Sequence, residues 1–363
     1  MSNSHNAYET QEKGTISICF VREALLVAKQ RGIATDALLS QSGIDPTLLE
    51  APQARISPRN YGALWLLLAE TMDDEFFGMD AHPMKVGSFT LLCHTLIHSS
   101  TLEVALQRAL RFFRLILDDI TGTLTVDKEI ADIRLQEKHG VARMFCYATF
   151  FVILHALSCW LVGRRIPILH ANFRCDEPEY NEECRVLFCN HTRYNTSITS
   201  MGFDADYLAL PVIQNERSMK EFLRGAPANF LVKYRNSDNM TAKIRRHLRN
   251  IPPEQWPNFE ALAAHFFSTE STLRRRLDRE GQSYQLIKDD LRRDLSIIYL
   301  SRPDAKVAEV ALWLGFSEPS AFHRAFKNWT GVNPGKYHQS CLQATDPLAR
   351  AAATYTLYSV TNH

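Results

Sequence analysis

The chain has 363 residues, more than one typical hydrophobic core holds, so two domains are expected. Its 45% apolar and 22% charged residues are those of an ordinary globular protein rather than of a disordered or fibrous one. The net charge of +1 hides an asymmetry: residues 229–340 hold 18 Lys and Arg against 12 Asp and Glu, whereas residues 1–228 hold 22 against 27. This division predicts a segment that binds a polyanion beside a domain with another task.

The first residues, MSNSHNAYETQEKG, lack the basic region and apolar core of a signal peptide, and we expect them to be disordered. The segment from Phe145 to Gly163 is uncharged and about 19 residues long, so it imitates a membrane span. It contains His155 and Ser158 and lies between segments typical of a soluble sheet. A buried core helix is therefore the favoured prediction and a membrane span the alternative. We expect a cytoplasmic protein with no membrane partner.

Eight cysteines in a chain without a signal peptide favour reduced thiols over a disulfide framework. The group Cys175, Cys184, Cys189 and His191 raises the question of a zinc site, but its spacings do not form the paired C-x₂₋₄-C units of structural zinc. Buried free cysteines usually act as small apolar residues. We therefore predict no metal and no cofactor.

The first half of the chain predicts helices. A helical region covers residues 17–42, and a second helix begins with Ser57 as N-cap and Pro58 in the first turn. A third begins at Ser100 or Thr101. Its apolar stripe consists of Leu102, Ala105, Leu106, Ala109 and Leu110.

A small sheet is predicted to follow. GTLTVDKEIADIRLQEK alternates as paired strands do, with VDKE as the hairpin turn. After the long apolar segment, ILHANFRC and RYNTSITSMGF indicate strands on either side of a helix, EYNEECRVLF. The N-terminal domain is therefore predicted to be α+β, mostly helical with a small sheet.

Periodicity is lost between Pro211 and Asn239, whereas Met240 to Gln339 indicates helices only. We predict four segments: an N-terminal domain over 15–215, a linker over 216–239, an all-α domain over 240–340 and a tail over 341–363.

The all-α domain contains an internal repeat. LAAHFFSTESTLRRRLDREG aligns with ALWLGFSEPSAFHRAFKNWTG at an offset of 49 residues. Each copy predicts a short helix, a turn and a second helix, and YQLIKDDLRRDLSIIYL forms a long amphipathic helix between them. The aligned pairs are Phe267 with Phe316, Ser268 with Ser317, Ser271 with Ser320, Leu273 with Phe322, Arg275 with Arg324 and Leu277 with Phe326. Two helix-turn-helix units joined by one helix are stronger evidence for a DNA-binding domain than either unit alone.

The second helix of each unit can enter a DNA major groove, about 12 Å wide. The candidate DNA-binding residues are Ser271, Thr272, Arg274, Arg275, Pro319, Ser320, His323, Arg324 and Lys327. Arg275 and Arg324 are the expected base readers, because arginine bonds guanine O6 and N7 as a fork. Lys327 is expected to contact a phosphate of the DNA backbone. An exposed arginine is most often merely solvated, but both copies place one at the same helical position.

Local signals support this arrangement. Ser317 or Glu318 is expected to cap the second reading helix, and Gly281 and Gly331 suit the helix ends. The connecting helix could hold the two readers about one turn of DNA apart, roughly 34 Å.

VAEVALWLGFSEPSAFHRAFKNWTGVNPGKY resembles the C-terminal signature of AraC/XylS transcription regulators, I-x-E-[IV]-A, G-F, S-x-F-x-R-x-F-K, G-x-x-P and Y. Residues 31–65 and SSTLEVALQRALRFF are similar to the subfamily with a helical, arabinose-binding-type N-terminal domain. The resemblance implies a bacterial, cytoplasmic regulator with two helix-turn-helix motifs on a seven-helix domain. It also implies activation through contact with RNA polymerase and a sensing or dimerising N-terminal domain. Ala321 departs from the signature, where the family often has an aromatic residue.

The chain is thus predicted to be a sequence-specific DNA-binding transcription regulator, with an activating role expected and double-stranded promoter or operator DNA as partner. A small-molecule effector and a homodimer are further expectations. The effector-binding residues are unknown from sequence; polar candidates on apolar stretches are Arg22, His94, His98 and His155, each more often a satisfied structural residue.

Two other classes stay open as alternatives. An effector-independent architectural DNA-binding protein would have a small or absent pocket in residues 15–215. An enzyme, such as a DNA-modifying enzyme that shares the module, would need catalytic residues. The sequence has no G-x-S-x-G, no H-E-x-x-H, no Gly-rich phosphate loop and no convincing Cys/His pair, so we predict no catalytic residues and no enzyme.

Overall fold

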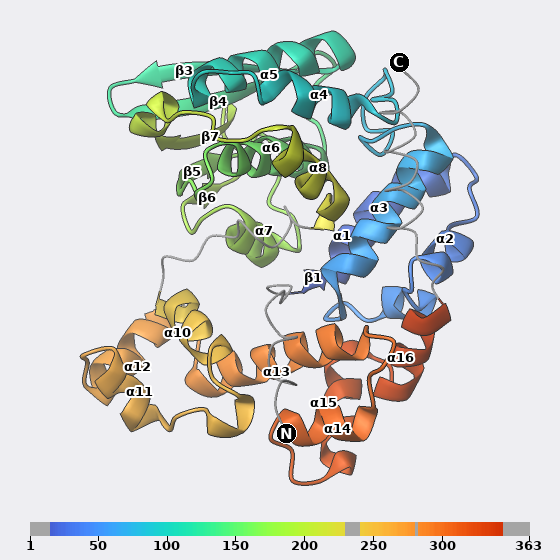
Figure 1. Ribbon diagram of the computed structural model, residues 1–363, viewed down its shortest axis with the longest axis vertical. Coiled ribbons are helices and arrows are strands. Elements are labelled where there is room, and N and C mark those ends of the chain that lie inside the picture. Colours follow the sequence, from blue (N-terminus) through green and yellow to red (C-terminus); the bar gives the residue numbers. More distant parts are fainter. Residues whose placement is uncertain (1–14, 229–239, 280–281, 344–363) are drawn as a thin grey trace.

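The computed structural model describes residues 15–228, 240–279 and 282–343, which form two bodies joined along one side (Figure 1). The N-terminal body holds helices and the sheet, and the C-terminal body is built from helices only within the described residues. The predicted disordered start, residues 229–239 of the predicted linker, Gly281 and the tail after residue 343 lie outside the described residues.

The N-terminal half is α+β, as predicted. Its helices are α1 (Ile18–Gln30), α2 (Thr35–Gln41), η2 (Pro46–Glu50), α3 (Pro58–Met72), α4 (Ser88–Leu96), α5 (Leu102–Ile116), α6 (Met144–Leu161), α7 (Asn181–Leu187), η3 (Ala205–Ala209) and α8 (Glu216–Gly225). Its strands are β1 (Ile16–Ser17), β2 (Arg55–Ile56), β3 (Ile120–Asp127), β4 (Ile130–Glu137), β5 (Ile168–Asn172), β6 (Thr192–Arg193) and β7 (Thr199–Asp204).

The predicted start signals of two helices are confirmed. Ser57 caps α3, since its Oγ accepts a hydrogen bond from Asn60 N over 3.1 Å, and Pro58 is the first helical residue. Thr101, not Ser100, caps α5 by accepting from Val104 N. All five residues of the predicted stripe on α5 are buried.

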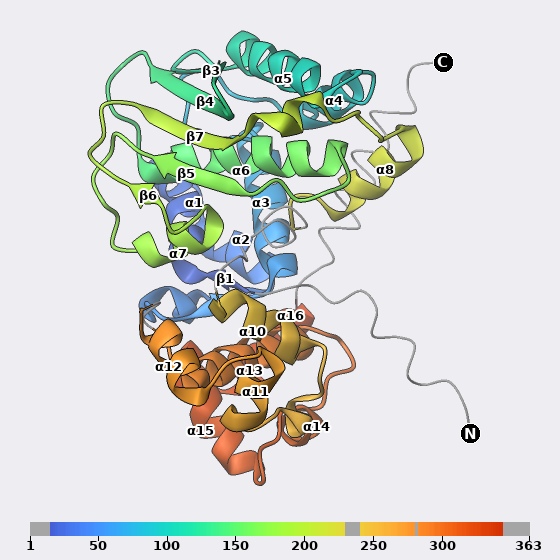
Figure 2. The ribbon, with the colours of Figure 1, turned by 90° about the vertical axis from the view of Figure 1, so that its left-hand side faces the viewer.

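The five-stranded sheet has the order β3-β4-β7-β5-β6 and is antiparallel except between β5 and β6. The predicted hairpin is β3–β4, with Lys128 and Glu129 at its turn. Helices α5 and α6 cover one face of the sheet (Figure 2). They approach so closely that a Cβ at Gly122 on β3 would lie 2.6 Å from Leu110 Cδ2.

The long apolar segment is α6, every residue of which is buried. It is the only helix among the described residues that is long and apolar enough to cross a membrane, and the whole of it lies inside the N-terminal body. The prediction of a core helix is therefore confirmed. An apolar surface all round is the composition that such a central position requires.

Two helices were not anticipated from sequence, α4 and α8. Helix α8 lies inside the range predicted as linker, where Asn215 and Ser218 form reciprocal capping hydrogen bonds of 3.1 and 3.0 Å. Its Phe222 ring stacks on Trp160 at a centroid distance of 4.4 Å. The predicted linker thus begins with a helix that packs on the N-terminal body. The sequence did not indicate this helix because the segment is short, mostly polar and buries only Met219 and Phe222.

The C-terminal half contains the predicted run of helices. They are α10 (Met240–Arg249), η4 (Pro253–Gln255), α11 (Phe259–His265), α12 (Glu270–Arg279), α13 (Tyr284–Leu300), α14 (Val307–Trp313), α15 (Pro319–Thr330) and α16 (Pro334–Gln343).

The second half of this bundle shares one hydrophobic core with the N-terminal body. Buried residues of α13 to α16, among them Leu300, Phe326 and Tyr337, belong to the same cluster as the N-terminal core. At the same contact, Lys336 Nζ lies 3.0 Å from Asp45 Oδ2. The part built from α10 to α12 and the start of α13 has a separate core.

A buried cluster of charges also joins the two bodies. Arg55 on β2 donates through both terminal nitrogens to the carboxylate of Glu183 on α7, and its Nε donates to Thr15 Oγ1 over 2.7 Å. The Thr15 hydroxyl in turn donates to Asp294 of α13, whose Oδ1 lies 3.9 Å from Arg55 Nε. On α13, Arg293 pairs with Asp290 at 3.0 Å and with Asp294 at 3.7 Å.

Opposite charges stabilise one another within this cluster. Burial disfavours the charge on Arg55, but the neighbouring carboxylates of Glu183 and Asp294 hold the pKa of its guanidinium above the usual value. Burial likewise disfavours ionisation of Asp294, and Arg293 and Arg55 lower the pKa of this carboxyl below its usual value.

Candidate DNA-binding surface

The first helix-turn-helix unit, α11 and α12, packs on a small core of its own. Leu273 and Leu277 of α12 are buried there, together with Ile244, Leu248, Leu262, Ala263, Tyr284, Ile287 and Leu291. Thr269 caps α12, since its Oγ1 accepts from Thr272 N over 3.3 Å. With the leucine face covered, the remaining face of α12 carries exposed Ser271, Arg274 and Arg275 and half-buried Thr272.

The second unit, α14 and α15, buries Phe322 and Phe326 completely. Pro319 is the first residue of α15, and Gly331 ends the helix in the left-handed conformation, with φ 84°. The candidates on the outer face, Pro319, Ser320, His323, Arg324 and Lys327, are all exposed.

The predicted cap of α15 is only partly correct. Glu318 stands at the N-cap position and Ser317 precedes it, but no side-chain capping hydrogen bond forms. Instead the Glu318 carboxylate accepts from Ser320 Oγ at 3.2 Å. This contact holds Ser320, a candidate DNA-binding residue, against an acidic neighbour at the N-terminal end of α15.

The repeat contains a one-residue difference in its turns. In the second unit Gly315 N donates to Leu312 O and Phe316 N to Ala311 O, over 2.9 and 3.1 Å. The matching hydrogen bonds of the first unit, both 3.0 Å long, come from Phe267 N to Ala264 O and from Ser268 N to Ala263 O.

The predicted pairs of Phe267 with Phe316 and Ser268 with Ser317 are therefore wrong: by these hydrogen bonds, Phe267 corresponds to Gly315. The offset of 49 residues is restored in the second helices, where Leu273 and Phe322 are both buried. The turn of the first unit is one residue shorter, which a single sequence offset could not reveal.

Phe267 consequently occupies a position that favours glycine. Its φ is 49° and its side chain is 100% exposed, whereas Gly315 has φ 78°. A bulky residue in this region costs roughly 1–2 kcal/mol. We expect Phe267→Gly to raise the free energy of unfolding by about 0.5–1 kcal/mol in urea titrations, since it relieves strain without exposing buried area. A loss of stability instead would show that the ring is packed in solution.

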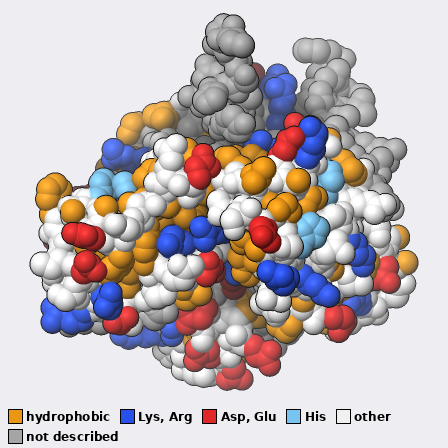
Figure 3. Space-filling view, turned by 90° about the horizontal axis from the view of Figure 1, so that it is seen from below, with side chains coloured by type: hydrophobic (Ala, Val, Ile, Leu, Met, Phe, Trp, Pro, Cys, Tyr) orange, Lys and Arg blue, Asp and Glu red, His pale blue; other side chains and the backbone are white. Residues whose placement is uncertain are grey.

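Basic side chains are spread over the face that the two units form. Figure 3 shows Lys and Arg on this face interleaved with hydrophobic and acidic side chains rather than gathered in one continuous patch. Arg275, Arg324 and Lys327 form no ion pair within the described part of the chain, and Arg274 lies 5.4 Å above the Phe259 ring. These cations are therefore available to an external anion, unlike the paired arginines of α13.

Comparison with known families matches both halves of the chain. Residues 32–212 match the model described as the arabinose-binding domain of AraC transcription regulator, N-term, and residues 262–340 match a helix-turn-helix domain. The chain belongs to the AraC/XylS family of transcription regulators. The AraC-family assignment agrees with the resemblance carried by the C-terminal signature, and it makes the protein a DNA-binding transcription regulator.

Curated relatives of this AraC-family regulator extend over different parts of it. The ornithine utilization regulator of Pseudomonas aeruginosa is 23% identical over 328 residues, which cover 90% of this chain and 96% of that protein. An uncharacterized HTH-type transcriptional regulator of Mycobacterium tuberculosis is 24% identical and covers 86% of this chain and 92% of its own. The urease operon transcriptional activator of Escherichia coli is 29% identical over 112 residues, which cover 31% of this chain and 38% of the activator.

These relatives and both matched domains are regulators, which decides against the enzyme alternative. Burial raises the pKa of the Cys19 thiol to about 11 and that of the Cys159 thiol to about 12. Among the residues that the structure describes, no three His, Cys, Asp or Glu side chains are placed to hold a metal ion.

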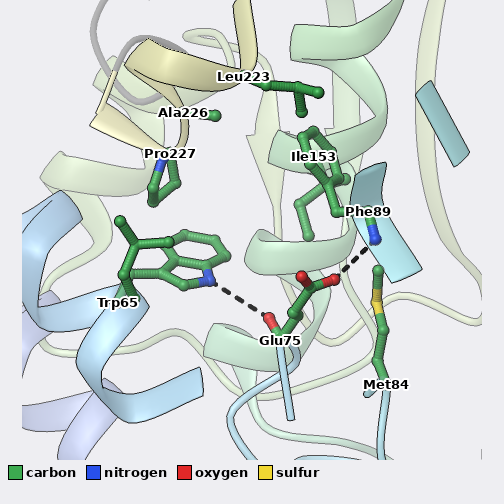
Figure 4. A pocket seen from close by; sticks show the side chains of 9 residues that line it. Trp65, Glu75, Met84, Phe89, Ile153, Leu223, Ala226 and Pro227 are labelled. Atoms are coloured by element: carbon green, nitrogen blue, oxygen red, sulfur yellow. Dashed lines mark hydrogen bonds between the residues drawn. The ribbon is translucent and has the colours of Figure 1, made fainter. Parts of the chain in front are cut away.

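The N-terminal domain of the regulator holds a cavity that the sequence candidates do not line. It lies between α3, α4, α6 and α8 and is lined by Trp65, Leu66, Glu75, Met84, Phe89, Ile153, Leu223, Ala226 and Pro227 (Figure 4). Arg22 instead donates to Leu49 O, and buried His155 Nε2 lies 2.8 Å from Ile166 O. His94 is half-buried and His98 exposed. Glu75 was missed because nothing in its local sequence marks it as a cavity residue.

Proposed function

We propose that this AraC-family regulator reads two successive major-groove segments with α12 and α15 and activates transcription under control of its N-terminal domain. The observation that carries the proposal is the pair of outward-facing helices with Arg275 and Arg324 at equivalent positions. Both side chains are exposed, and neither forms an ion pair in the described part of the chain.

Each candidate residue has a role suited to its chemistry. Arg275 and Arg324 would bond guanine O6 and N7, with Arg274 and His323 beside them. Lys327, one turn further along α15, would hold phosphate. Ser271, Thr272, Pro319 and Ser320 lie in the first turns, the part of a recognition helix that enters the groove deepest.

Helix α13 is the element that would set the spacing of the two readers. Its 17 residues give it a length of about 25 Å at 1.5 Å per residue, and Ser283 caps its start by accepting from Leu286 N over 3.1 Å. The reading helices pack near its opposite ends, which suits a separation of about one turn of DNA, roughly 34 Å.

Control by the N-terminal domain is supported by the contacts between the two bodies. The second unit shares its core with that domain, whereas the first unit has a core of its own. The orientation of the first reader relative to the second therefore depends on α13, which the cluster around Arg55 ties to the N-terminal domain. A small-molecule effector would act by binding one arrangement better than another.

The proposals of an activating role, partners and location rest on similarity to other members of the family. An activating role is supported by the relative named as the urease operon transcriptional activator, which matches the DNA-binding half. RNA polymerase contact, a homodimer and a cytoplasmic location in a bacterium are proposed with it. We propose a sensing domain (15–215), a DNA-binding domain (240–340) and a tail (341–363), and of the predicted linker (216–239) the first part, α8, packs on the sensing domain.

Selection of genomic DNA fragments by the purified full-length protein tests base reading. We expect enrichment of a two-segment site, and we expect Arg324→Ala to lose the preference at one segment only, at a cost of about 1–3 kcal/mol. Arg217→Ala is the matched control: it also removes one positive charge, from an exposed side chain on α8.

The alternative is an effector-independent architectural protein. It predicts that Arg324→Ala weakens binding equally on all fragments, with a steep dependence on salt and no sequence motif. That result would overturn the proposal of sequence-specific reading.

A further inference from the structure

We infer that Arg292 of α13 is a positioning residue that fixes the orientation of the two reading helices, α12 and α15, relative to each other. This inference rests on the proposed reading of two DNA segments, and it assigns the spacing between those segments to one side chain. The sequence does not mark Arg292, because the residue lies in a helix expected only to connect the two units.

Helix α13 contributes to two hydrophobic cores at different points along its length (Figure 1). Its first turns place Ile287 and Leu291 in the core of the first unit, and its last turns place Ile297 and Leu300 in the core that the second unit shares with the N-terminal body. Arg292 lies between these two sets of residues. A long side chain at this point can reach both units at once.

On one side, Arg292 contacts the turn of the second unit. Its Nε donates to Leu314 O over 3.1 Å. Leu314 stands at the end of α14, where backbone carbonyls lack donors from their own helix. The guanidinium also lies 5.6 Å from the centre of the Phe316 ring, and that ring contacts buried Phe322 of α15 at a centroid distance of 5.4 Å. Arg292 is thereby connected to the second reading helix.

On the other side, Arg292 contacts the segment that leads into the first unit. Its guanidinium lies 5.6 Å from the centre of the Trp256 ring. The indole is itself fixed, since its Nε1 donates to Leu248 O over 2.9 Å and to Ile251 O over 3.1 Å, and it packs on the core of the first unit. A planar guanidinium is suited to contact aromatic faces, so one cation joins a ring of each unit.

The side chain of Arg292 is directed into the protein rather than toward DNA. It is 23% exposed, whereas Arg275 and Arg324 are fully on the outer faces of their helices. Its ion pair with Asp289 is 3.7 Å long and involves a carboxylate that is 40% exposed, and pairs of this kind contribute little. The hydrogen bond to Leu314 and the two rings are therefore the contacts that hold it.

The two units also approach each other closely at this point. A Cβ on Gly315, in the turn of the second unit, would lie 3.8 Å from Arg292 Nη2 and 3.8 Å from Glu254 Cα of η4. Loss of the Arg292 contacts would free the turn to shift against η4, which rotates one reading helix relative to the other. Because B-DNA has about 10–10.5 base pairs per turn, a rotation of roughly 35° shifts the preferred spacing by one base pair.

Selection from a random-sequence duplex library by the full-length protein measures the spacing of the two segments. We expect the wild type to select one spacing, and Arg292→Met to select sites whose spacing varies by at least one base pair. Methionine keeps an apolar stem but removes the donor and the planar cation. Insertion of one base pair into the site selected by the wild type is expected to weaken the wild type roughly tenfold and the variant less than about threefold.

Further variants separate orientation from charge and from loss of the fold. Arg292→Lys keeps the charge but lacks the planar group and the Nε donor, so we expect it to resemble Arg292→Met. Phe316→Leu leaves Arg292 in place but removes one ring, and it is also expected to broaden the selected spacing. Arg217→Ala, on exposed α8, is expected to leave the spacing unchanged. A wild-type spacing preference in both Arg292 variants, or an equal loss of affinity at every spacing, would overturn the inference.

A distance measurement without DNA separates this inference from the proposed reading of two segments. Nitroxide-bearing non-natural amino acids at Arg276 and Asn328, exposed positions on α12 and α15, report the distance between the reading helices by electron paramagnetic resonance. We expect a narrow distribution of distances in the wild type and a broader one in Arg292→Met.

The two measurements fail independently of each other. If the distribution broadens in Arg292→Met but the wild type selects only one DNA segment, the positioning role stands and the reading of two segments fails. If the wild type selects two segments but the distribution is the same in the variant, the reading stands and Arg292 does not position the helices.

Discussion

Arg55→Ala is expected to lower the free energy of unfolding of the full-length regulator by about 3–5 kcal/mol. The guanidinium is the cation between Glu183 and Asp294, and its side chain is only 12% exposed. Its removal leaves two carboxylates of low exposure without their shared cation, and it also deprives Thr15 of two hydrogen bonds. Urea denaturation followed by tryptophan fluorescence measures the loss.

An exposed ion pair provides the control for this prediction. Arg217 and Glu221 are 3.6 Å apart on α8, with side chains 91% and 62% exposed. Pairs of this kind contribute little, so Arg217→Ala is expected to change stability by less than about 0.5 kcal/mol. If Arg55→Ala costs no more than Arg217→Ala, the cluster does not stabilise the contact between the two bodies.

Arg55→Lys separates charge from geometry. Lysine keeps the positive charge but cannot donate to Glu183 through a planar fork and to Thr15 through a third nitrogen at the same time. An intermediate loss of stability is expected. Because the cluster joins β2 and α7 to α13, we also expect both variants to increase cleavage by trypsin between the two bodies.

The DNA-binding half could be predicted from sequence because its signals are local. Phe322 and Phe326 lie four residues apart and both are buried on one helix face, as their spacing predicts. Pro319 at the start of α15 and Gly331 at its end have fixed conformational meanings that do not depend on the rest of the fold.

The contacts between the two bodies could not be predicted, because they join residues far apart in sequence. Thr15 and Asp294 are 279 positions apart, and neither stands out in its own segment. Glu75 gains its place in the cavity only because Asp74 folds its loop beneath α3 and α4. The shorter turn at Phe267 could not be predicted either, because the aligned residues of the two copies still match at one constant offset of 49 residues.

Lowering the pH from 7 to 5 is expected to remove about 2 kcal/mol of stability through His155 alone. This histidine lies in the middle of α6 and is buried, and its Nε2 is 2.8 Å from Ile166 O, to which it donates in its neutral form. Burial disfavours the imidazolium and lowers the pKa of His155 to about 4.

The direction of this pH dependence follows from the pKa of His155 in the unfolded chain and in the native protein. An unfolded histidine has a pKa of about 6.5, so between pH 6.5 and 4 the unfolded chain takes up a proton that the native protein does not. The stabilisation is fully present above pH 6.5 and is lost as the pH falls toward 4, at about 1.4 kcal/mol per pH unit.

A variant isolates this contribution from that of the carboxyl groups. His155→Gln removes the titrating ring, and we expect the stability difference between wild type and variant to shrink by about 2 kcal/mol between pH 7 and pH 5 in urea titrations. His98→Gln, at an exposed side chain outside the core, is the control for the substitution itself. A difference for His155→Gln that does not change with pH would mean that water reaches the ring in the native state and that the core around α6 is less closed than its buried residues imply.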